Sequence, residues 1–503
     1  MTHLKKFQEP ALLFNFGQAV EDPRDGLTLF GPLDQGKPYG IRAGVLGTKD
    51  GITRFVRWVE RIQKPATNDP PEIARPPFPG FETAFQIPWN PEPALRIEIP
   101  PEELQSVFIS DKHQRVYKTV QIFSDRIIQA IKGEDTKVDI WFVIIPDDVY
   151  QYCRPLSTVD ADLLIPAKNV LSATYAKQIQ TQSSIFPEDN AAAIPYHYEV
   201  NFHNQLKARL LAYDSPTQII KESTLAPDDF LDRFGKPTRN LAGQESAIAW
   251  NIATAVFYKA GGRPWKIGSI RDGVCYIGLV FKIDERNPDP RAACCAAQMF
   301  LDSGDGIVFK GDIGPWYSGK KGEFHLKRKA AQELIKIAVD SFKDRRDGKP
   351  PKELFIHGKV RFNDEEWDGF KSVVDKETNL VGVKIRDEED LKVYRKGDMP
   401  VLRGQAYIRD SRSGYLWTRG YIPRLKTYVG REVPNPLSID VCRGEAPMEI
   451  VLQDILALTK LNYNACIFAD GLPVTLRFAN AVGEILTAGP LEKVPPLPFK
   501  YYI

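Results

Sequence analysis

The sequence predicts an α/β protein with two domains, each built on its own sheet. Three observations lead to this prediction. An uninterrupted apolar run opens a series in which strand and helix patterns alternate, and a second series further along places three strands, a helix and another strand in order. The 39 prolines cluster in connecting stretches, notably residues 65–80 and 489–499, which are typical of irregular surface segments.

The first series begins with the apolar run VDIWFVII at residues 138–145, which Pro146 closes. A continuous run of this length is typical of a strand that is buried on both faces of a parallel sheet. A helix, a strand and a longer helix are expected next, at residues 199–213, 217–221 and 244–259. The last helix ends before Gly261-Gly262, and glycine just past a helix is the expected stop. The alternation predicts a Rossmann-like domain at residues 135–265.

The second series begins with the strand GVCYIGLVFKI at residues 273–283. Two shorter strands, a long helix and a further buried strand are expected at residues 294–301, 306–312, 325–345 and 353–359. This order is that of an RNase H-like core, and it predicts a second domain at residues 266–503. Residues 1–134 are expected to form an N-terminal region that packs on both domains. The order of elements alone says little about function, which must be argued from a site.

Length and charge set broad limits. A chain of 503 residues has room for two to four domains. With 67 basic and 65 acidic side chains the net charge is only +2, so any basic groove for a nucleic acid must be local. No apolar stretch is long enough for a signal peptide or a membrane span, and we expect a cytoplasmic protein that does not contact membranes.

The six cysteines show no C-x-x-C spacing, and the neighbours Cys294 and Cys295 could not easily form an ordinary disulfide. Free thiols in a reducing compartment are the simplest interpretation. The chain ends in Tyr501-Tyr502-Ile503, an aromatic and apolar sequence that is unusual for a free tail. Because chain ends fray unless something holds them, this tail is expected to be docked against the protein.

Several segments resemble, in order along the chain, parts of the MID and PIWI domains of Argonaute proteins. They are DPRDGLTLFGPL (22–33) with GIRAGVLGT (40–48), FYKAGGRPW (257–265) and DILALTKLNYNACIFADGLPVTLRFANAVGEIL (454–486). The resemblance is to short prokaryotic Argonautes, and it implies a Rossmann-like MID domain and an RNase H-like PIWI domain without N or PAZ domains. The run at 292–317 and the ending FKYYI are similar to the Argonaute subunit of SPARTA systems, in which a short Argonaute pairs with a TIR–APAZ protein.

The resemblance implies a pocket for the 5′-phosphate of a guide strand. The matching positions are His203, Lys207, Gln218 and Lys259. Residues four apart on a helix lie on one face, as His203 and Lys207 would, and a compact ammonium suits a terminal phosphate. Taken singly, a His–Lys pair on a helix is usually a solvated face, and a lysine before two glycines usually a favourable charge at a helix end.

One position of this pocket departs from the family. A further lysine is common one helical turn before Lys259, and here that position is Ala255. The departure implies that another positive charge is needed, and the resemblance points to Mg²⁺ held partly by the terminal carboxylate of Ile503. A terminal phosphate carries nearly two negative charges at neutral pH, so one or two lysines with a metal ion would balance it.

Argonautes that cut use a set of acidic residues, sometimes with a histidine, to hold two Mg²⁺ ions. The matching positions here are Val280, Lys359 and Asn480, none of which is an anionic ligand. The family's glutamate position could not be assigned. The three acidic residues at 364–366 begin a predicted helix, where they favour its N-terminus. The sequence therefore predicts no catalytic residues and a protein that binds without cutting.

The resemblance implies a guide-directed sensor of a prokaryotic immune system. A guide RNA would pair with complementary single-stranded DNA and thereby activate the TIR–APAZ partner, which hydrolyses NAD and kills the invaded cell. The chain itself has no G-x-G-x-x-G fingerprint after its strands, and Gly304-Asp305-Gly306 is better interpreted as a hairpin turn. A heterodimer with the partner, and a larger assembly after target binding, are expected.

Three alternatives remain. The partner could be a sirtuin-like or nuclease effector. The chain could be a guided nuclease with a non-standard metal site, which metal-dependent cleavage by the purified chain would reveal. It could also be a structural subunit that only stabilises its partner, in which case loss of Lys207 and Lys259 would leave signalling intact.

Overall fold

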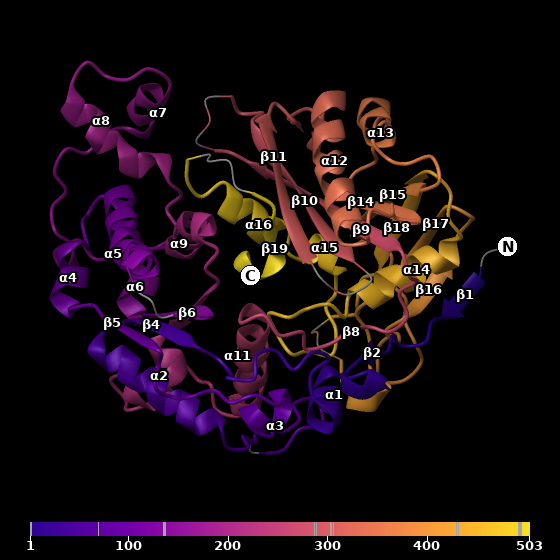
Figure 1. The fold of residues 1–503 in the computed structure, drawn as a ribbon, viewed down its shortest axis with the longest axis horizontal. Coiled ribbons are helices and arrows are strands. Elements are labelled where there is room, and N and C mark those ends of the chain that lie inside the picture. Colours follow the sequence, from indigo (N-terminus) through magenta and orange to yellow (C-terminus); the bar gives the residue numbers. More distant parts are fainter. Residues whose placement is uncertain are drawn as a thin grey trace.

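A computed structural model describes residues 3–503 except 69, 134–136, 286, 288, 302–303, 305, 429, 431 and 491–494. Two lobes stand side by side in Figure 1, with α11 and the end of the chain between them. The first lobe contains a four-stranded sheet and the second a ten-stranded sheet. None of the described helices is both long enough and apolar enough to cross a membrane.

The four-stranded sheet of the first lobe is parallel throughout, in the order β5-β4-β6-β7. Its strands are β4 (Ala43–Gly47), β5 (Leu95–Glu98), β6 (Ile140–Ile145) and β7 (Thr217–Lys221). All six residues of β6 are buried, as its apolar sequence predicts. Helix α2 (Lys49–Ile62) covers one face, while α5 (Lys112–Gly133) and α9 (Phe202–Leu210) cover the other (Figure 1).

The prediction of a Rossmann-like fold is confirmed: the sheet is parallel and has helices on both faces. Two of its four strands, β4 and β5, come from residues before 135, so the sheet extends across the boundary drawn between the N-terminal region and the first domain. The domain ranges themselves stay a prediction. Short apolar β4 (AGVLG) contains two glycines, which hid its strand character from the sequence pattern.

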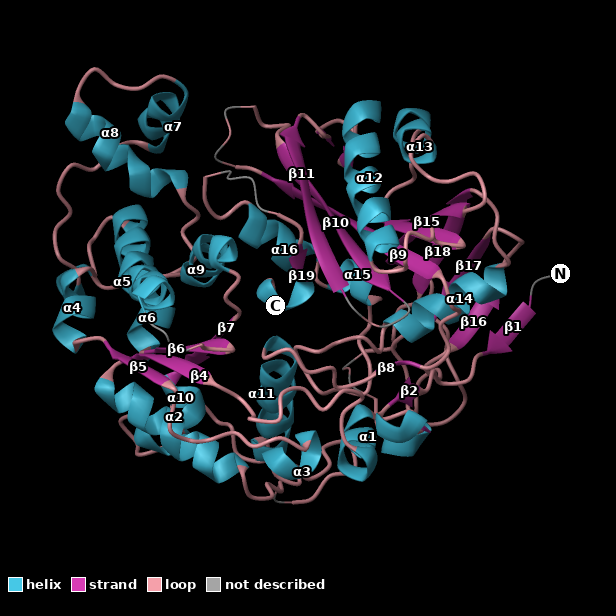
Figure 2. Cartoon of the chain, viewed as in Figure 1, coloured by secondary structure: helices cyan, strands magenta, loops and turns pink. Residues whose placement is uncertain are grey.

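The ten-stranded sheet has the order β1-β16-β17-β18-β15-β14-β9-β10-β11-β19. Towards one edge of this sheet, β9, β10 and β11 form an antiparallel meander, and β14 runs parallel to β9, as expected for an RNase H-like core. Side chains on β9 alternate between two cores: Ile277 and Leu279 pack toward α12 and α13, and Tyr276 and Val280 pack toward α14, α15 and α16. Figure 2 shows these helices on the two faces of the sheet.

The strands of this sheet are β1 (His3–Lys6), β9 (Val274–Ile283), β10 (Ala293–Leu301), β11 (Gly306–Gly314), β14 (Glu353–Gly358), β15 (Asn379–Asp387), β16 (Gln405–Ile408), β17 (Ser413–Leu416), β18 (Leu437–Arg443) and β19 (Leu497–Pro498). The helices on it are α12 (Arg328–Asp344), α13 (Asp364–Lys371), α14 (Met448–Leu458), α15 (Val474–Arg477) and α16 (Ala479–Leu486). Every element expected from the second series is present. The hairpin turn expected at 304–306 lies partly outside the described residues, although β10 and β11 do pair.

The remaining elements connect the lobes or decorate them. Strands β2 (Leu12–Leu13), β3 (Ala19–Val20) and β8 (Lys266–Ile267) form a small sheet beneath the lobes, beside α1 (Pro23–Phe30) and α3 (Phe81–Phe85). Helices α7 (Ala173–Thr181) and α8 (Pro187–Ala193) project from the first lobe (Figure 1). The others are α4 (Pro101–Ser106), α6 (Asp147–Tyr152), α10 (Glu222–Leu225), α11 (Glu245–Lys259), β12 (Tyr317–Ser318) and β13 (Glu323–Phe324).

The end of the chain is docked, as its apolar aromatic sequence predicts. Strand β19 pairs with β11, and the side chains of Tyr502 and Ile503 are only 1% and 7% exposed. The tail ends between α9 of the first lobe and the second lobe (Figure 1). This position brings its last residue to the polar groups described next.

Candidate functional site

The structure brings the four residues of the predicted phosphate pocket together from three elements. His203 and Lys207 lie on α9, Gln218 on β7, and Lys259 at the end of α11. Lys259 Nζ donates to Gln218 Oε1 at 2.8 Å and to the main-chain oxygen of Thr217 at 3.1 Å. Lys207 Nζ donates to the main-chain oxygen of Ile503, which places the docked tail in the same site. We call this site the α9 hollow.

Each element is held in place by its own sequence. The side chain of Asn201 caps α9 by accepting a hydrogen bond from the amide of Asn204, so the helix begins just before His203. Helix α11 ends at Lys259 because Gly261, with φ of 105°, takes a backbone conformation that side chains with a Cβ disfavour. Lys259 therefore lies in the last turn, where a positive charge is favourable.

Both lysines of the α9 hollow are buried: the exposed fractions are 3% for Lys207 and 1% for Lys259. In the described part of the chain, neither ammonium forms an ion pair with an Asp or Glu side chain. Burial lowers the pKa of Lys207 to about 7. Burial, together with the charge of Lys207, lowers the pKa of Lys259 well below its ordinary value. The terminal carboxylate of Ile503 is the one acidic group on either lysine among the described residues, so the two ammonium groups are only partly compensated and favour a further anion.

His203, unlike the two buried lysines, is exposed. Its Nδ1 is 3.0 Å from the side-chain oxygen of Asn204. The surrounding protein and the charges of Lys207 and Lys259 lower the pKa of His203, so the imidazole is neutral at neutral pH. A neutral ring is suited to stacking and hydrogen bonding, whereas the positive charge lies on the buried lysines.

Ala255, the position at which the family often has a lysine, is buried at 2% exposure on α11. It lies one turn before Lys259 on that helix. Among the four predicted positions and Ala255, the positive side chains are therefore those of Lys207 and Lys259.

The three positions predicted to replace cutting residues lie on neighbouring elements of the second lobe. Val280 is on β9 and is 1% exposed, Lys359 follows β14 and is exposed, and Asn480 is exposed on α16. Helix α16 packs close to β9: a Cβ added at Gly483 would lie 3.4 Å from Cγ1 of Val280. Among the described residues, no three His, Cys, Asp or Glu side chains gather as ligands for a metal ion.

The acidic residues at 364–366 lie at the start of helix α13, as predicted, and two of them accept hydrogen bonds from main-chain amides. Asn363 and Glu366 form a reciprocal capping box at the start of α13. Glu366 also accepts a hydrogen bond from the amide of Leu326 at 2.7 Å, and Glu365 accepts one from the amide of Arg328 at 3.3 Å. Their oxygen atoms are occupied by this network rather than directed at a metal site.

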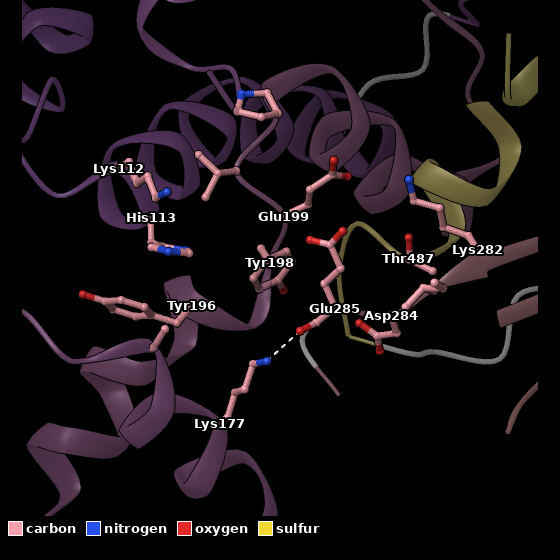
Figure 3. A pocket seen from close by; sticks show the side chains of 14 residues that line it. Lys112, His113, Lys177, Tyr196, Tyr198, Glu199, Lys282, Asp284, Glu285 and Thr487 are labelled. Carbon is pink, nitrogen blue, oxygen red and sulfur yellow. Dashed lines mark hydrogen bonds between the residues drawn. The ribbon is translucent and has the colours of Figure 1, made fainter. Parts of the chain in front are cut away.

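A pocket of about 390 Å³ between the lobes was not anticipated from the sequence (Figure 3). Lys177 Nζ on α7 closes one side by donating to the main-chain oxygen of Glu285 at 2.6 Å. The ring of His113 stacks on Tyr196 with centroids 4.5 Å apart. The polar lining of the pocket comes from α5, α7, the segment before α9 and the end of β9. Its polar residues include Lys112, His113, Lys177, Tyr196, Glu199, Lys282, Asp284 and Glu285. These segments are far apart in sequence, so no local pattern announces the pocket.

No protein-family model and no curated protein matches this chain. The fold, by contrast, matches solved Argonaute structures. Clostridium butyricum Argonaute bound to a guide DNA and a 19-mer target DNA superposes with a TM-score of 0.61 at 16% identity, over 97% of this chain and 53% of that one. Aquifex aeolicus Argonaute with externally bound siRNA gives 0.55 at 15% identity, over 99% of this chain and 56% of that one.

Drosophila Piwi gives a TM-score of 0.57 at 13% identity, over 99% of this chain and 56% of that one. The chain thus spans about half the length of each of these proteins. At these identities the likeness concerns the fold: the chain has the architecture of the MID and PIWI domains of Argonautes.

Proposed function

We propose that this protein is a short Argonaute that binds a guide strand by its 5′-phosphate and reads a complementary target by base pairing. The observation that carries the proposal is the convergence of two buried lysines in the α9 hollow: Lys259 has only neutral acceptors, and Lys207 has the terminal carboxylate of Ile503 as its one acidic partner among the described residues. A fold shared with an Argonaute solved with guide and target DNA supports it. Specificity would then reside in the guide, while the protein supplies the grip on its end.

A terminal phosphate fits the charge and the geometry of this site. It brings nearly two negative charges and three acceptor oxygens, enough for both ammonium groups and the Gln218 amide. The phosphate would replace the Ile503 oxygen as the acceptor for Lys207. His203, which is exposed, would contact the first nucleotide.

The proposal includes Mg²⁺ beside the phosphate. Mg²⁺ is usually bound through one or two carboxylates together with substrate phosphates. The terminal carboxylate of Ile503 would be the protein ligand of this ion, and the guide phosphate would be the other. Without the phosphate, the charges of Lys207 and Lys259 would repel the cation. When bound, the ion would supply the positive charge that Ala255 does not.

The proposed protein binds without cutting. Val280, Lys359 and Asn480 supply a hydrocarbon, an ammonium and an amide where cutting Argonautes place metal ligands. A hydrocarbon cannot bind Mg²⁺, and the Lys359 charge would repel it.

The finer part of the proposal rests on the resemblance to SPARTA Argonautes. It assigns an RNA guide, a single-stranded DNA target and a TIR–APAZ partner whose NAD hydrolysis follows target pairing. Purified chain, candidate partner, guide and target would be mixed and NAD followed over time. Consumption only when all four are present supports the assignment, and consumption that ignores the target contradicts it.

The phosphate grip can be tested on the full chain with one RNA of fixed sequence, carrying either a 5′-phosphate or a 5′-hydroxyl. The wild type is expected to bind the phosphorylated RNA more tightly by roughly 10- to 100-fold, because charge-assisted hydrogen bonds contribute about 1.5–3 kcal/mol each. Lys207→Ala with Lys259→Ala is expected to abolish the preference. Filter binding or fluorescence anisotropy measures both affinities.

The matched control is Lys329→Ala. Lys329 lies on α12, outside the α9 hollow, and its side chain is 87% exposed. This variant is expected to keep the full preference. Equal affinity of the wild type for the two RNAs would contradict the proposal. So would a preference that survives in the Lys207, Lys259 double variant.

A further inference from the structure

A pocket of about 460 Å³ lies in the first lobe and belongs to none of the sites described above. Its lining comes from α2 and the segment after it, from α10 and the chain between α10 and α11, and from the start of α11. Figure 2 shows α2, α10 and α11 close together, whereas α9 lies on the opposite face of the parallel sheet. Pockets that hold small molecules usually measure roughly 300–1,000 Å³, so the size admits a ligand such as an aromatic amino acid.

Two sets of contacts hold the walls of this pocket in place. Arg54 and Arg57 of α2 donate to Asp229, in the chain after α10, at 3.0 and 2.8 Å. Asn68 exchanges two hydrogen bonds with Ser246 at the start of α11, at 2.8 and 3.2 Å. The elements around the pocket are thus tied together before a ligand arrives, which lowers the cost of binding.

The inner wall of the pocket is apolar. It includes Trp58 and Ile62 of α2 and Ala249 of α11, each of which is only 2% exposed. These side chains belong to the core of the first lobe, and the pocket gives access to their edge. An apolar group that enters the pocket would remove this surface, and its own, from water.

Trp58 also has an unused hydrogen-bond donor. No described residue accepts a hydrogen bond from its Nε1, and this nitrogen is not fully enclosed by the protein. Other buried tryptophans have partners: Trp250 Nε1 donates to the main-chain oxygen of Pro77, and Trp265 Nε1 to that of Lys460, both at 3.2 Å. Buried tryptophans usually find such a partner. Because Trp58 lines the pocket and is otherwise buried, a ligand in the pocket can supply the missing acceptor.

The pocket is also lined by two arginines and two acidic residues, Arg61, Arg239, Asp228 and Glu245. Within the described parts of the chain, none of the four forms an ion pair. Arg239 Nη1 donates to Thr224 Oγ1, which leaves its Nε–Nη2 edge without a partner and not fully enclosed. That edge is the fork that binds two oxygens of a carboxylate side by side. The lining therefore offers sites for both signs of charge and has no net charge of its own.

We propose that this pocket binds an apolar α-amino acid. The carboxylate of the ligand lies on the Nε–Nη2 edge of Arg239, Asp228 or Glu245 accepts hydrogen bonds from its ammonium, and its side chain packs against Trp58. A lining without net charge gives no advantage to a bare anion or a bare cation, whereas a zwitterion with an apolar side chain is complementary to all of its parts. The inference does not rest on the proposed function, because no nucleic acid takes part.

The first test measures the binding of L-leucine, L-phenylalanine and L-tryptophan to the full chain by calorimetry and by the melting temperature. At least one is expected to bind and to raise the melting temperature. The best of them is then compared with its amine, which lacks the carboxylate, and with its acid, which lacks the ammonium. Each analogue is expected to bind roughly 10-fold more weakly or worse, the effect of a lost charge-assisted contact. Absence of binding by all three amino acids, or equal binding of an analogue, would overturn the inference.

The second test locates the ligand. Arg239→Met is expected to weaken binding of the amino acid by roughly 10-fold and to leave binding of its amine unchanged. The control is Arg233→Met, because Arg233 lies in the same connection, is exposed and does not line the pocket. This variant is expected to bind as the wild type does. An equal loss of affinity in both variants would contradict the proposed carboxylate site.

The third test fills the pocket. Ala242 is an exposed residue of the lining, so Ala242→Trp is expected to abolish binding and to keep the melting temperature of the free protein close to that of the wild type. Binding that survives in both Ala242→Trp and Arg239→Met would place the ligand elsewhere and overturn the inference. Arg239→Lys keeps the charge but not the fork, and it replaces the methionine variant if that one does not fold. The comparison of the analogues on the wild type requires no variant at all.

Discussion

Lys259 has hydrogen bonds but no compensating charge. Its ammonium donates to two neutral oxygen atoms, those of Thr217 and Gln218. Such acceptors replace some of the water around a buried ammonium but do not neutralise it, which is why its pKa falls well below the ordinary value. The unfolded chain holds this proton up to the ordinary pKa of 10.5, whereas the folded protein releases it earlier.

Consequently, the free energy of unfolding of the wild type should rise with pH below about 10.5, because the unfolded state binds more protons there. Lys259→Met removes the titrating ammonium and with it this contribution to the rise of the free energy of unfolding with pH. Chemical denaturation of both proteins between about pH 8 and pH 10 measures the difference. Lys329→Met, which changes an exposed lysine, should follow the wild type. Parallel curves for the wild type and Lys259→Met would contradict this account.

His325 is the opposite case. Burial would lower its pKa, but hydrogen bonds to Glu366 at 2.9 Å and Glu323 at 3.2 Å outweigh burial and raise it. A raised pKa in the folded state stabilises the protein fully below the unfolded value of 6.5, and this contribution is lost as pH rises through the folded value.

His325→Gln should therefore cost most at about pH 6, where the wild type is protonated at this site. The cost should shrink by up to about 1 kcal/mol as pH rises past the folded pKa, since the side chain is partly exposed and the pair is screened. Melting temperatures of both proteins across this range test it. If the difference in melting temperature between the two proteins does not change with pH, Glu323 and Glu366 do not raise the pKa of His325.

Among the elements, β9 and α15 approach each other more closely than any side chain would allow. A Cβ added at Gly278 would lie 1.9 Å from the main-chain oxygen of Thr475. Gly278→Ala must therefore push α15 away from the sheet, and it is expected to lower the free energy of unfolding by roughly 1–3 kcal/mol, the usual cost of overpacking. Gly319→Ala, which meets nothing within 4 Å, is the control and should be nearly neutral. Equal stability of both variants would contradict the close packing.

The elements that the sequence predicted well share a simple signature. Strands β6, β7, β9 and β14 are apolar runs ended by proline, glycine or a charged turn, and the observed bounds agree with the expected ones within about two residues. Helix α11 was placed because its glycine stop is local. The residues of the α9 hollow were singled out only through resemblance, since nothing local distinguishes Lys207 and Lys259 from solvated lysines, and their role stays a prediction.

Features that depend on distant contacts were not predicted. Strand β1 carries two lysines and has no apolar pattern, and it becomes a strand only by pairing with β16. Arg209 is a plain helix residue in the sequence, and its stacking partner Tyr117 lies on another helix. The same holds for the pocket in Figure 3, whose lining comes from both lobes.

For the molecule as a whole, a net charge of +2 leaves little general attraction for nucleic acid. Binding should therefore depend on a few local phosphate contacts, each of which releases counterions and steepens the dependence on salt. Removing Lys207 and Lys259 together should reduce the slope of log affinity against log salt by roughly 1 for a 5′-phosphorylated strand. Titrations at several salt concentrations measure this. An unchanged slope would place the phosphate elsewhere.

Residues 3–6 pair with residues 405–408 as β1 and β16, so the edge of the large sheet joins segments some 400 positions apart. A ribosome adds roughly 5–20 residues per second, so β1 waits tens of seconds for its partner to be made. During that time its main-chain amides are satisfied by water or by a chaperone. The sheet edge is closed late in synthesis, by a segment made some 400 residues earlier than its partner.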